Sequence, residues 1–168
     1  EGVDKLFGGL GNDIYYLDNA SESAKDEIDG GWDSVYTTAS CVLTPYIEGL
    51  FLLGTANITA TGNALDNLVF GNSGNNKIDG SLGNDSLAGD LGADIFVFGL
   101  NSGKDVIIDF VAADKDQINL KAYSHGTAFG GGITVTQTGD HVTIDMGGGN
   151  TVFVQYTTRA DVISHIVW

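Results

Sequence analysis

The sequence has little cysteine, proline or positive charge, and each shortage argues against a class of protein. Its 168 residues include a single cysteine, Cys41, so no disulfide can form within the chain. A single proline, Pro45, and 25 glycines are untypical of a helical bundle. Twenty-two acidic residues against seven basic ones give a net charge of −15, which disfavours nucleic acids and anionic membrane surfaces as partners. No apolar run reaches the ~20 residues of a membrane span, so we expect none.

The remaining composition is that of a folded, acidic, glycine-rich chain. Aromatic residues make up 10% of it, which argues against disorder. A mass of 17.5 kDa corresponds to one domain or one elongated module.

A nine-residue period organises residues 62–97. Four units follow one another without a gap: GNALDNLVF, GNSGNNKID, GSLGNDSLA and GDLGADIFV. Each unit begins with glycine and has Asn or Asp at its sixth place. The eighth place is always apolar, and its occupants are Val69, Ile78, Leu87 and Phe96. A fixed period of this kind indicates a stacked repeat architecture.

The residues of one unit predict its local structure. Glycine and asparagine tolerate positive φ, so the first part of each unit can turn sharply. The three residues around the apolar eighth place make a short strand that points one side chain inward. A chain that alternates such turns and strands must coil, with two units per turn. The sequence therefore predicts an all-β fold, a parallel β-roll with a thin apolar core and two edges of stacked loops.

These loop edges create an electrostatic problem. Stacking brings Asp66 near Asp85, and Asn75 near Asp94, and residues five and six of a unit are expected to face opposite neighbours. Carboxylates held a few ångströms apart repel one another unless a cation lies between them. Oxygen ligands without His or Cys select a hard cation, so we expect Ca²⁺.

The four units resemble the glycine- and aspartate-rich nonapeptide of the RTX (repeats-in-toxin, hemolysin-type) calcium-binding family. This resemblance implies a right-handed parallel β-roll or β-helix with Ca²⁺ as its cofactor. A glycine-rich linker or a metal-free solenoid is the alternative, but a linker needs no apolar residue at every ninth place. Asn67 and Asn76 stand where the family has Asp, so sites that rely on them should be weaker or empty.

Partial copies of the unit precede the repeat. Residues 1–7 fit the end of a unit with Asp4 in the sixth place, and residues 8–16 form a full unit with Asp13 in that place. Residues 30–36 recover the pattern with Asp33 in the sixth role. Because Asp4 and Asp13 would face loops that this chain lacks, we expect the chain to be the C-terminal piece of a longer protein. The acidic stretch that includes Asp26 is expected to be a solvated loop.

The segment after the repeat, residues 99–120, resembles the one that closes RTX rolls. It predicts a strand around Val106–Ile108, with Asp105 and Asp109 contacting calcium; solvation at a strand end is the alternative. Asp116 precedes a further apolar alternation.

The C-terminal residues predict a cap. Residues 133–138 and 141–146 alternate apolar and polar side chains around a Gly139-Asp140 turn, which predicts a hairpin, and residues 151–156 predict a third strand. Thr158 with Asp161 predicts the start of a short helix that ends near His165. This cap resembles the C-terminal secretion signal of type I exporter substrates, although an ordinary antiparallel cap explains the strands equally well. We therefore divide the chain into a roll at 1–120, with an irregular larger-coil insertion at 17–61, and a cap at 121–168.

These arguments assign three calcium sites between stacked loops. One lies between the Gly62 and Gly80 loops with Asp66 and Asp85. A second lies between the Gly71 and Gly89 loops with Asn75 and Asp94. A third joins Asn84 to Asp105 or Asp109. The full set of expected ligand positions is Asp4, Asp13, Asp33, Gly62, Asp66, Gly71, Asn75, Asn76, Gly80, Asn84, Asp85, Gly89, Asp94, Asp105 and Asp109.

No common catalytic motif occurs in the sequence: HExxH, GxSxG, a phosphate-binding loop and CxxC are all missing. His125, His141 and His165 are far apart and are expected to be surface or hairpin residues. The resemblance implies a noncatalytic, extracellular module that folds on calcium after type I secretion and assists a larger enzyme. Its expected partners are calcium, an upstream domain of the same polypeptide and the type I exporter. A polysaccharide-binding module using Tyr15, Tyr16, Trp32 and Tyr36, and an adhesin or surface-layer repeat, are the alternatives.

Overall fold

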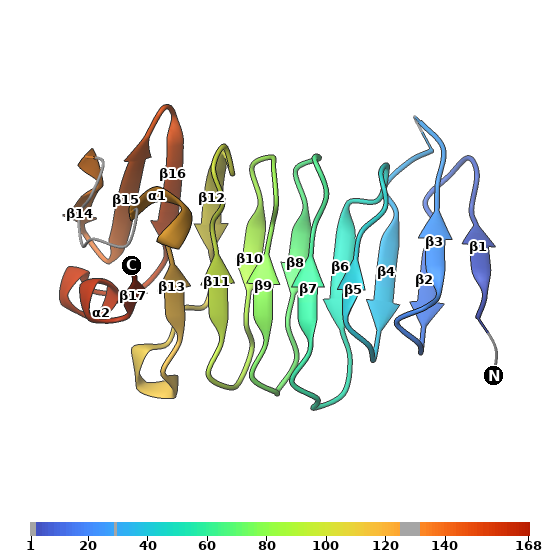
Figure 1. Ribbon diagram of the computed structural model, residues 1–168, viewed down its shortest axis with the longest axis horizontal. Coiled ribbons are helices and arrows are strands. Elements are labelled where there is room, and N and C mark those ends of the chain that lie inside the picture. Colours follow the sequence, from blue (N-terminus) through green and yellow to red (C-terminus); the bar gives the residue numbers. More distant parts are fainter. Residues whose placement is uncertain (1–2, 29, 125–131) are drawn as a thin grey trace.

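The computed structural model describes residues 3–28, 30–124 and 132–168 and shows an elongated parallel β-solenoid of about six turns. The turns follow one another along the long axis, from β1 at one end to the C-terminal strands at the other (Figure 1). The fold is all-β, with few helices and with antiparallel strands only at its C-terminal end, among the described residues. This confirms the fold class expected from the nonapeptide.

One face of the solenoid is a sheet of nine strands within the described ranges. Its order is β14-β15-β16-β12-β10-β8-β6-β4-β2, and all its neighbours from β16 to β2 are parallel. The strands are β2 (Ile14–Leu17), β4 (Ser34–Thr37), β6 (Gly49–Leu52), β8 (Leu68–Phe70), β10 (Ser86–Ala88), β12 (Lys104–Ile107), β14 (Thr134–Thr138), β15 (His141–Gly147) and β16 (Asn150–Val154).

The opposite face is a six-stranded sheet with the order β17-β13-β11-β9-β7-β5, and a separate parallel pair, β1 and β3, precedes it. Its strands are β5 (Cys41–Val42), β7 (Thr59–Thr61), β9 (Lys77–Asp79), β11 (Ile95–Val97), β13 (Gln117–Asn119) and β17 (Ile166–Val167), and the pair is β1 (Lys5–Phe7) with β3 (Ser23–Lys25). Strand β3 lies within the acidic stretch that we expected to be a loop, so that expectation is wrong for residues 23–25.

The predicted core positions are confirmed. Val69, Ile78, Leu87 and Phe96 are fully buried, and each stacks in register on the eighth place of the unit one turn away. Leu87 pairs with Val69, 18 residues earlier in the chain. Since each three-residue strand of the nonapeptide points its central side chain inward, the core of residues 62–97 is a thin apolar layer between the two sheets.

A second stack of side chains lies outside this core, on β2, β4, β6 and β8. The rings of Tyr16, Tyr36, Phe51 and Phe70 stack face to face, with centroids 5.4, 4.7 and 5.7 Å apart. Parallel in-register strands place identical positions side by side, so aromatic residues repeated at one position stack in this way.

The C-terminal strands extend both sheets of the solenoid. Strand β16 pairs in parallel with β12, and β17 pairs in parallel with β13. The predicted hairpin is confirmed as β14 and β15, which pair antiparallel, and β15 also pairs antiparallel with β16. Helix α2 (Arg159–Ser164) starts as predicted, because the Thr158 side chain accepts a hydrogen bond from the Asp161 N–H. A short helix α1 (Lys121–Ser124) and a 3-10 turn η1 (Ala112–Asp114) were not predicted.

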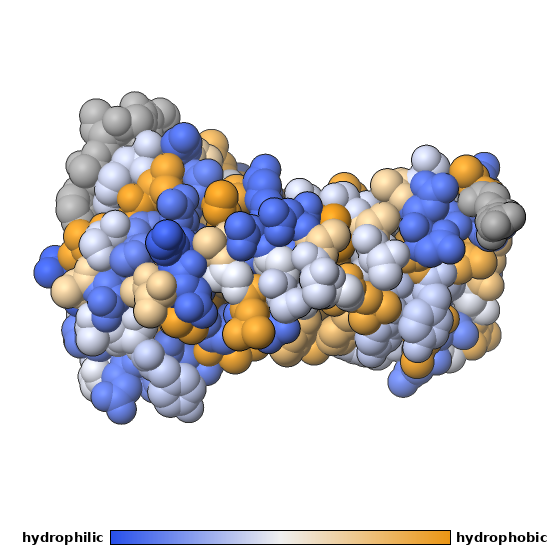
Figure 2. All heavy atoms as spheres, turned by 90° about the horizontal axis from the view of Figure 1, so that it is seen from below, coloured by the Kyte–Doolittle hydropathy of each residue, from blue (hydrophilic) through white to orange (hydrophobic). Residues whose placement is uncertain are grey.

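The space-filling view shows a body that is thicker at the C-terminal end than in its middle (Figure 2). Hydrophilic and hydrophobic residues are intermixed on the face seen there. In the described part of the chain, no helix is long and apolar enough to span a membrane.

Candidate metal centre

The loop edges of the roll stack so tightly that only glycine fits at certain places. Gly83 has a φ of +116° and Gly92 a φ of +123°, values that L-residues with a side chain rarely adopt. A Cβ at Gly92 would lie 2.6 Å from the carbonyl oxygen of Gly74, one turn earlier. The fourth-place glycines therefore let the backbones of successive loops approach each other closely.

First-place glycines make room for polar atoms instead. A Cβ at Gly62 would collide with the carbonyl oxygen of Gly80, and one at Gly71 with the carbonyl oxygen of Gly89. At Gly80 and Gly89 the collision would be with the carboxylate at the sixth place of the same unit. Oxygen atoms thus fill the space beside every first-place glycine of the repeat.

The fifth places of the units form an exposed ladder of hydrogen bonds. Oδ1 of Asp66 accepts from the backbone N–H of Asn84 at 2.7 Å, and Oδ1 of Asn75 accepts from the N–H of Ala93 at 2.9 Å. Oδ1 of Asn84 in turn accepts from the N–H of Lys104 at 3.1 Å. The polar fifth-place side chains Asp66, Asn75 and Asn84 therefore each bind the loop one turn later in the sequence.

The sixth places form a second ladder, which is buried and runs the opposite way. Oδ1 of Asp85 accepts from the backbone N–H of Asn67 at 2.7 Å, one turn earlier, and Oδ1 of Asp105 accepts from the N–H of Asp85 at 3.0 Å. The side chains of three further acids accept a hydrogen bond from the preceding turn in the same way. Their Oδ1 atoms accept from backbone N–H groups as follows: Asp33 from Asp13, Asp94 from Asn76, and Asp116 from Asp94. The expectation that places five and six face opposite neighbours is confirmed.

The second carboxylate oxygen of most of these aspartates has no protein partner. Among the described residues, Oδ2 of Asp13, Asp33, Asp85, Asp94 and Asp105 is buried and accepts no hydrogen bond. Asp33 and Asp94 are completely buried, and Asp85 and Asp105 are at most 2% exposed. A buried carboxylate oxygen is costly to leave without a partner, so each of these atoms is a candidate ligand for a cation.

The pKa values of these groups show how unfavourable their charges are without a cation. Burial, together with the charges of Asp105 and Asp66, raises the pKa of Asp85 to about 8. Burial likewise raises the pKa of Asp94 to about 7 and that of Asp105 to about 6. For Asp33 and Asp116, burial is again the largest cause of a raised pKa.

Comparison with known families identifies the motif that builds this arrangement. A family model described as the RTX calcium-binding nonapeptide repeat matches residues 1–19 and 61–96, with four copies. The chain carries RTX calcium-binding repeats. The extracellular lipase LipA from Serratia marcescens is similar in structure over 98% of this chain, with 17% identity and a TM-score of 0.45. The chain spans 38% of that lipase. No curated protein sequence matches it.

The donor atoms along the RTX roll fit calcium. Carboxylate and carbonyl oxygens are the ligands that Ca²⁺ prefers, and the sixth places contribute only oxygen or amide groups. Asp85, Asp94 and Asp105 would hold ions through their Oδ2 atoms, and a bound ion would supply the positive charge that these carboxylates lack.

At the sixth places that carry asparagine, Asn67 and Asn76, the side-chain amide forms hydrogen bonds within the protein and needs no metal ion. Nδ2 of Asn67 donates to the carbonyl oxygens of Ile47 at 3.1 Å and Glu48 at 3.4 Å. Nδ2 of Asn76 donates to those of Ala56 and Ile58, both at 3.4 Å. Because the amide N–H₂ group points at converging carbonyl oxygens, it satisfies oxygens that could otherwise have been ligands. Asn76 is therefore a poor ligand candidate.

Two other predicted ligands are not among the acids with a buried oxygen that lacks a hydrogen-bond partner in the described residues. Asp4 is exposed just before β1. Asp109 accepts at both carboxylate oxygens, from the N–H groups of Gly89 and Asp90, each at 2.8 Å. Of the two acids proposed to close the last site, Asp105 has a buried oxygen without a partner and Asp109 does not.

The expected ligand set does not include three acids of this system. Glu48 accepts from the Asp33 N–H at 2.8 Å and extends the sixth-place ladder through the irregular coil, and Asp116 extends it at the other edge. Both stand two residues before a buried core residue, Leu50 and Ile118, which is the spacing of the nonapeptide and would have identified them. Asp26 has no such spacing.

The histidines take no part in this system in the described residues. His141 packs against the rings of Phe153 and Tyr156, with centroids 5.0 and 5.1 Å away. His165 ends α2, with its Nδ1 2.8 Å from the carbonyl oxygen of Asp161. His125 lies outside the described residues.

Proposed function

We propose that this chain is a calcium-dependent folding module of a larger extracellular protein, which it stabilises or assists. The observation that carries the proposal is the row of buried aspartate Oδ2 atoms without hydrogen-bond partners. Within it, we propose Asp85, Asp94 and Asp105 as the principal ligands, with oxygens of the Gly62, Gly71, Gly80 and Gly89 loops around them.

The physical basis is a balance between a thin core and stacked negative charge. Each strand of the repeat adds a single buried side chain, such as Leu87 or Phe96, to the core. Without a cation, the buried carboxylates oppose folding, because their charged forms are poorly solvated. Calcium binds only the folded roll and shifts the equilibrium by mass action, by about 4 kcal/mol per site when its concentration is ~1,000 times the dissociation constant.

This balance also suggests a biological use. At submicromolar calcium, as in the cytosol, the repeat region would be unfolded and able to pass through a type I exporter. At millimolar calcium outside the cell it would fold, together with an upstream domain of the same polypeptide. The net charge of −15 supports this use, because self-repulsion keeps the calcium-free chain expanded.

The polysaccharide-binding alternative has less support. Tyr15 is buried, at 4% exposure, and cannot stack on a sugar. Tyr36 is covered on both faces, by Tyr16 and Phe51, within the aromatic stack. Rings that cover each other present their edges rather than a flat platform to the solvent.

A calcium titration followed by circular dichroism tests the proposal. We expect a cooperative gain of β signal between excess chelator and millimolar calcium. Magnesium should not reproduce it, because Mg²⁺ demands octahedral geometry and gives up its water reluctantly. A repeat region that is fully folded in excess chelator would contradict the proposal.

A further inference from the structure

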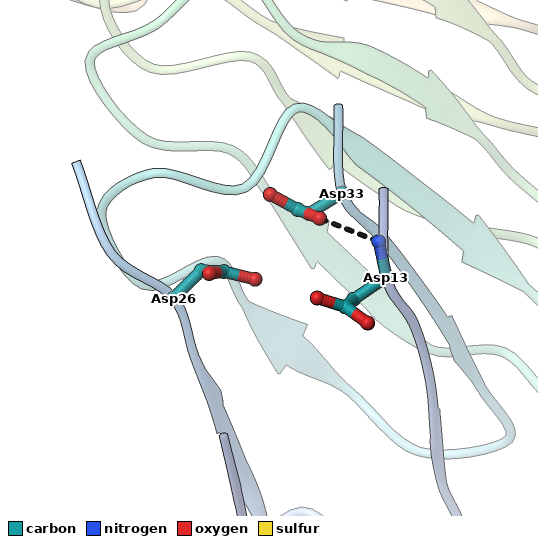
Figure 3. A group of neighbouring side chains, drawn as sticks. All are labelled: Asp13, Asp26 and Asp33. Atoms are coloured by element: carbon teal, nitrogen blue, oxygen red, sulfur yellow. Dashed lines mark hydrogen bonds between the residues drawn. The ribbon is translucent and has the colours of Figure 1, made fainter. Parts of the chain in front are cut away.

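Three carboxylates from three different segments meet near the first turns of the solenoid. Asp13 precedes β2, Asp26 follows β3 and Asp33 precedes β4. One carboxylate oxygen from each lies within 4.8 Å of the others. Figure 3 shows the Asp13 and Asp26 carboxylates facing each other across a gap, with the Asp33 carboxylate beside it.

The Asp33 side chain supplies an independent sign of a missing cation. It is completely buried, and its Oδ1 accepts from the Asp13 N–H at 2.7 Å. Its Oδ2 is buried and has no partner among the described residues, and neither has Oδ2 of Asp13. A fully buried charged oxygen beside two further carboxylates is stable only if a cation joins them.

The position of Asp26 is fixed by the core rather than by the repeat. The hydroxyl of Tyr15, a buried core residue, donates to Asp26 Oδ2 and also lies 3.2 Å from the carbonyl oxygen of Lys25. Asp26 Oδ1 accepts from the N–H of Glu27 at 2.7 Å. A Cβ at Gly30 would lie only 2.8 Å from this Oδ1, so glycine leaves room for the carboxylate.

We propose that Asp13, Asp26 and Asp33 bind one Ca²⁺ ion, with Asp26 as a ligand from outside the nonapeptide pattern. This inference rests on the proposed function and adds a site to it. Three carboxylates give the site a formal charge of −3, and the charge count of the ligands is a main determinant of calcium affinity. The ion would bind the irregular segment between β2 and β4 to the regular roll.

Asp26→Asn and Glu27→Gln form a matched pair for the test. Each removes one negative charge by an isosteric change, and they are adjacent in sequence. The Glu27 side chain is exposed and lies outside the cluster, whereas an asparagine at 26 can still accept the Tyr15 hydrogen bond.

Calorimetric calcium titration of the whole chain counts the ions bound. Tyrosine-sensitised Tb³⁺ emission reports on this site in particular, because the Tyr15 hydroxyl contacts Asp26.

We expect Asp26→Asn to weaken one calcium site by about tenfold or more and to lower the Tb³⁺ emission, with the other sites unchanged. Glu27→Gln should match the wild type in both measurements. Equal titrations for both variants and the wild type, or equal losses in both variants, would overturn the assignment of Asp26. A wild-type chain that binds no calcium would instead refute the proposed function itself. Circular dichroism at saturating calcium confirms that each variant is folded.

Discussion

Two kinds of loop contact lie side by side in this roll, and they differ in a single side-chain group. At Asp85 and Asp94 the sixth place presents a buried carboxylate oxygen that has no partner in the protein. At Asn67 and Asn76 it presents an amide that donates to two carbonyl oxygens of the preceding turn. The comparison shows that a stacked loop edge needs a positive or hydrogen-bond-donating group at this place. In the function proposed above, a metal ion would provide it in one case, and the side chain itself provides it in the other.

The largest effect should come from removing the carboxylate altogether. Asp85→Ala deletes a proposed calcium ligand and leaves the buried N–H of Asn67 without its acceptor. The unsatisfied donor alone should cost about 1–3 kcal/mol, and the lost ligand should raise the calcium concentration at half-folding by about tenfold or more. Calcium titration followed by circular dichroism measures the shift.

Asp140→Ala is the control for this change, because Asp140 is an exposed residue in the turn between β14 and β15. It should leave the calcium midpoint unchanged. If both alanine variants shift the midpoint equally, the ligand assignment of Asp85 is wrong.

Replacing a sixth-place amide by a carboxylate should have a smaller effect. Asn67→Asp replaces an amide donor by a carboxylate that faces the carbonyl oxygens of Ile47 and Glu48. At limiting calcium the chain should lose about 1–2 kcal/mol in urea unfolding, because the carbonyl groups lose their donor. At millimolar calcium most of the loss should disappear, since the new carboxylate can bind an ion.

Asn57→Asp makes the same substitution at an exposed residue outside the expected ligand set, where the side chain accepts from the N–H of Asn75 at 2.8 Å. It should be nearly neutral at both calcium concentrations. A loss at Asn67→Asp that does not depend on calcium would show that the two kinds of contact are not interchangeable.

The smallest effect concerns pH and follows from the raised carboxylate pKa values. Because Asp85, Asp94 and Asp105 have pKa values of about 8, 7 and 6 in the metal-free fold, well above the ordinary value of 3.8, the fold binds protons more tightly than the unfolded chain does. The metal-free fold therefore loses stability as pH rises from about 4 to 8. Above pH 6 these carboxylates are already ionised in the unfolded chain, so the loss of protons destabilises only the fold and the calcium concentration at half-folding should rise slightly as pH rises from 6 to 8.

Titrations at pH 6, 7 and 8 measure this dependence. Asp85→Asn, which removes the group with the highest of the three pKa values, should flatten the profile. A wild-type midpoint that is constant over this range would show that the carboxylates are already ionised in the metal-free fold.

The sequence predicted the parts of the fold that depend on local chemistry. The core positions from Val69 to Phe96 follow from the nine-residue period, and the start of α2 follows from Thr158 and Asp161, because both signals lie within a few residues. Strand β3 was missed because its residues, Ser23–Lys25, are mostly polar and follow no period.

Contacts between segments that are distant in sequence could not be predicted from local sequence patterns. The parallel pairing of β16 with β12 joins residues almost fifty positions apart, and no local pattern encodes it. Asp26 approaches Asp13 and Asp33 only because the irregular coil folds back along the roll. The stacked sixth places, in contrast, were predictable because two units make one turn.

The direction of the backbone hydrogen bonds has a mechanical consequence. From β2 to β13, each strand bonds to strands one turn away, so these bonds lie nearly parallel to the long axis of the molecule (Figure 1). Tension along that axis would break the hydrogen bonds of one strand pair after another, because each pair carries the load in turn. It would not shear all pairs of a sheet at the same time. Each 18-residue turn such as that from Val69 to Leu87 would release about 60 Å of chain. The roll should therefore lengthen in steps at low force and behave as a compliant tether with a calcium-dependent stiffness.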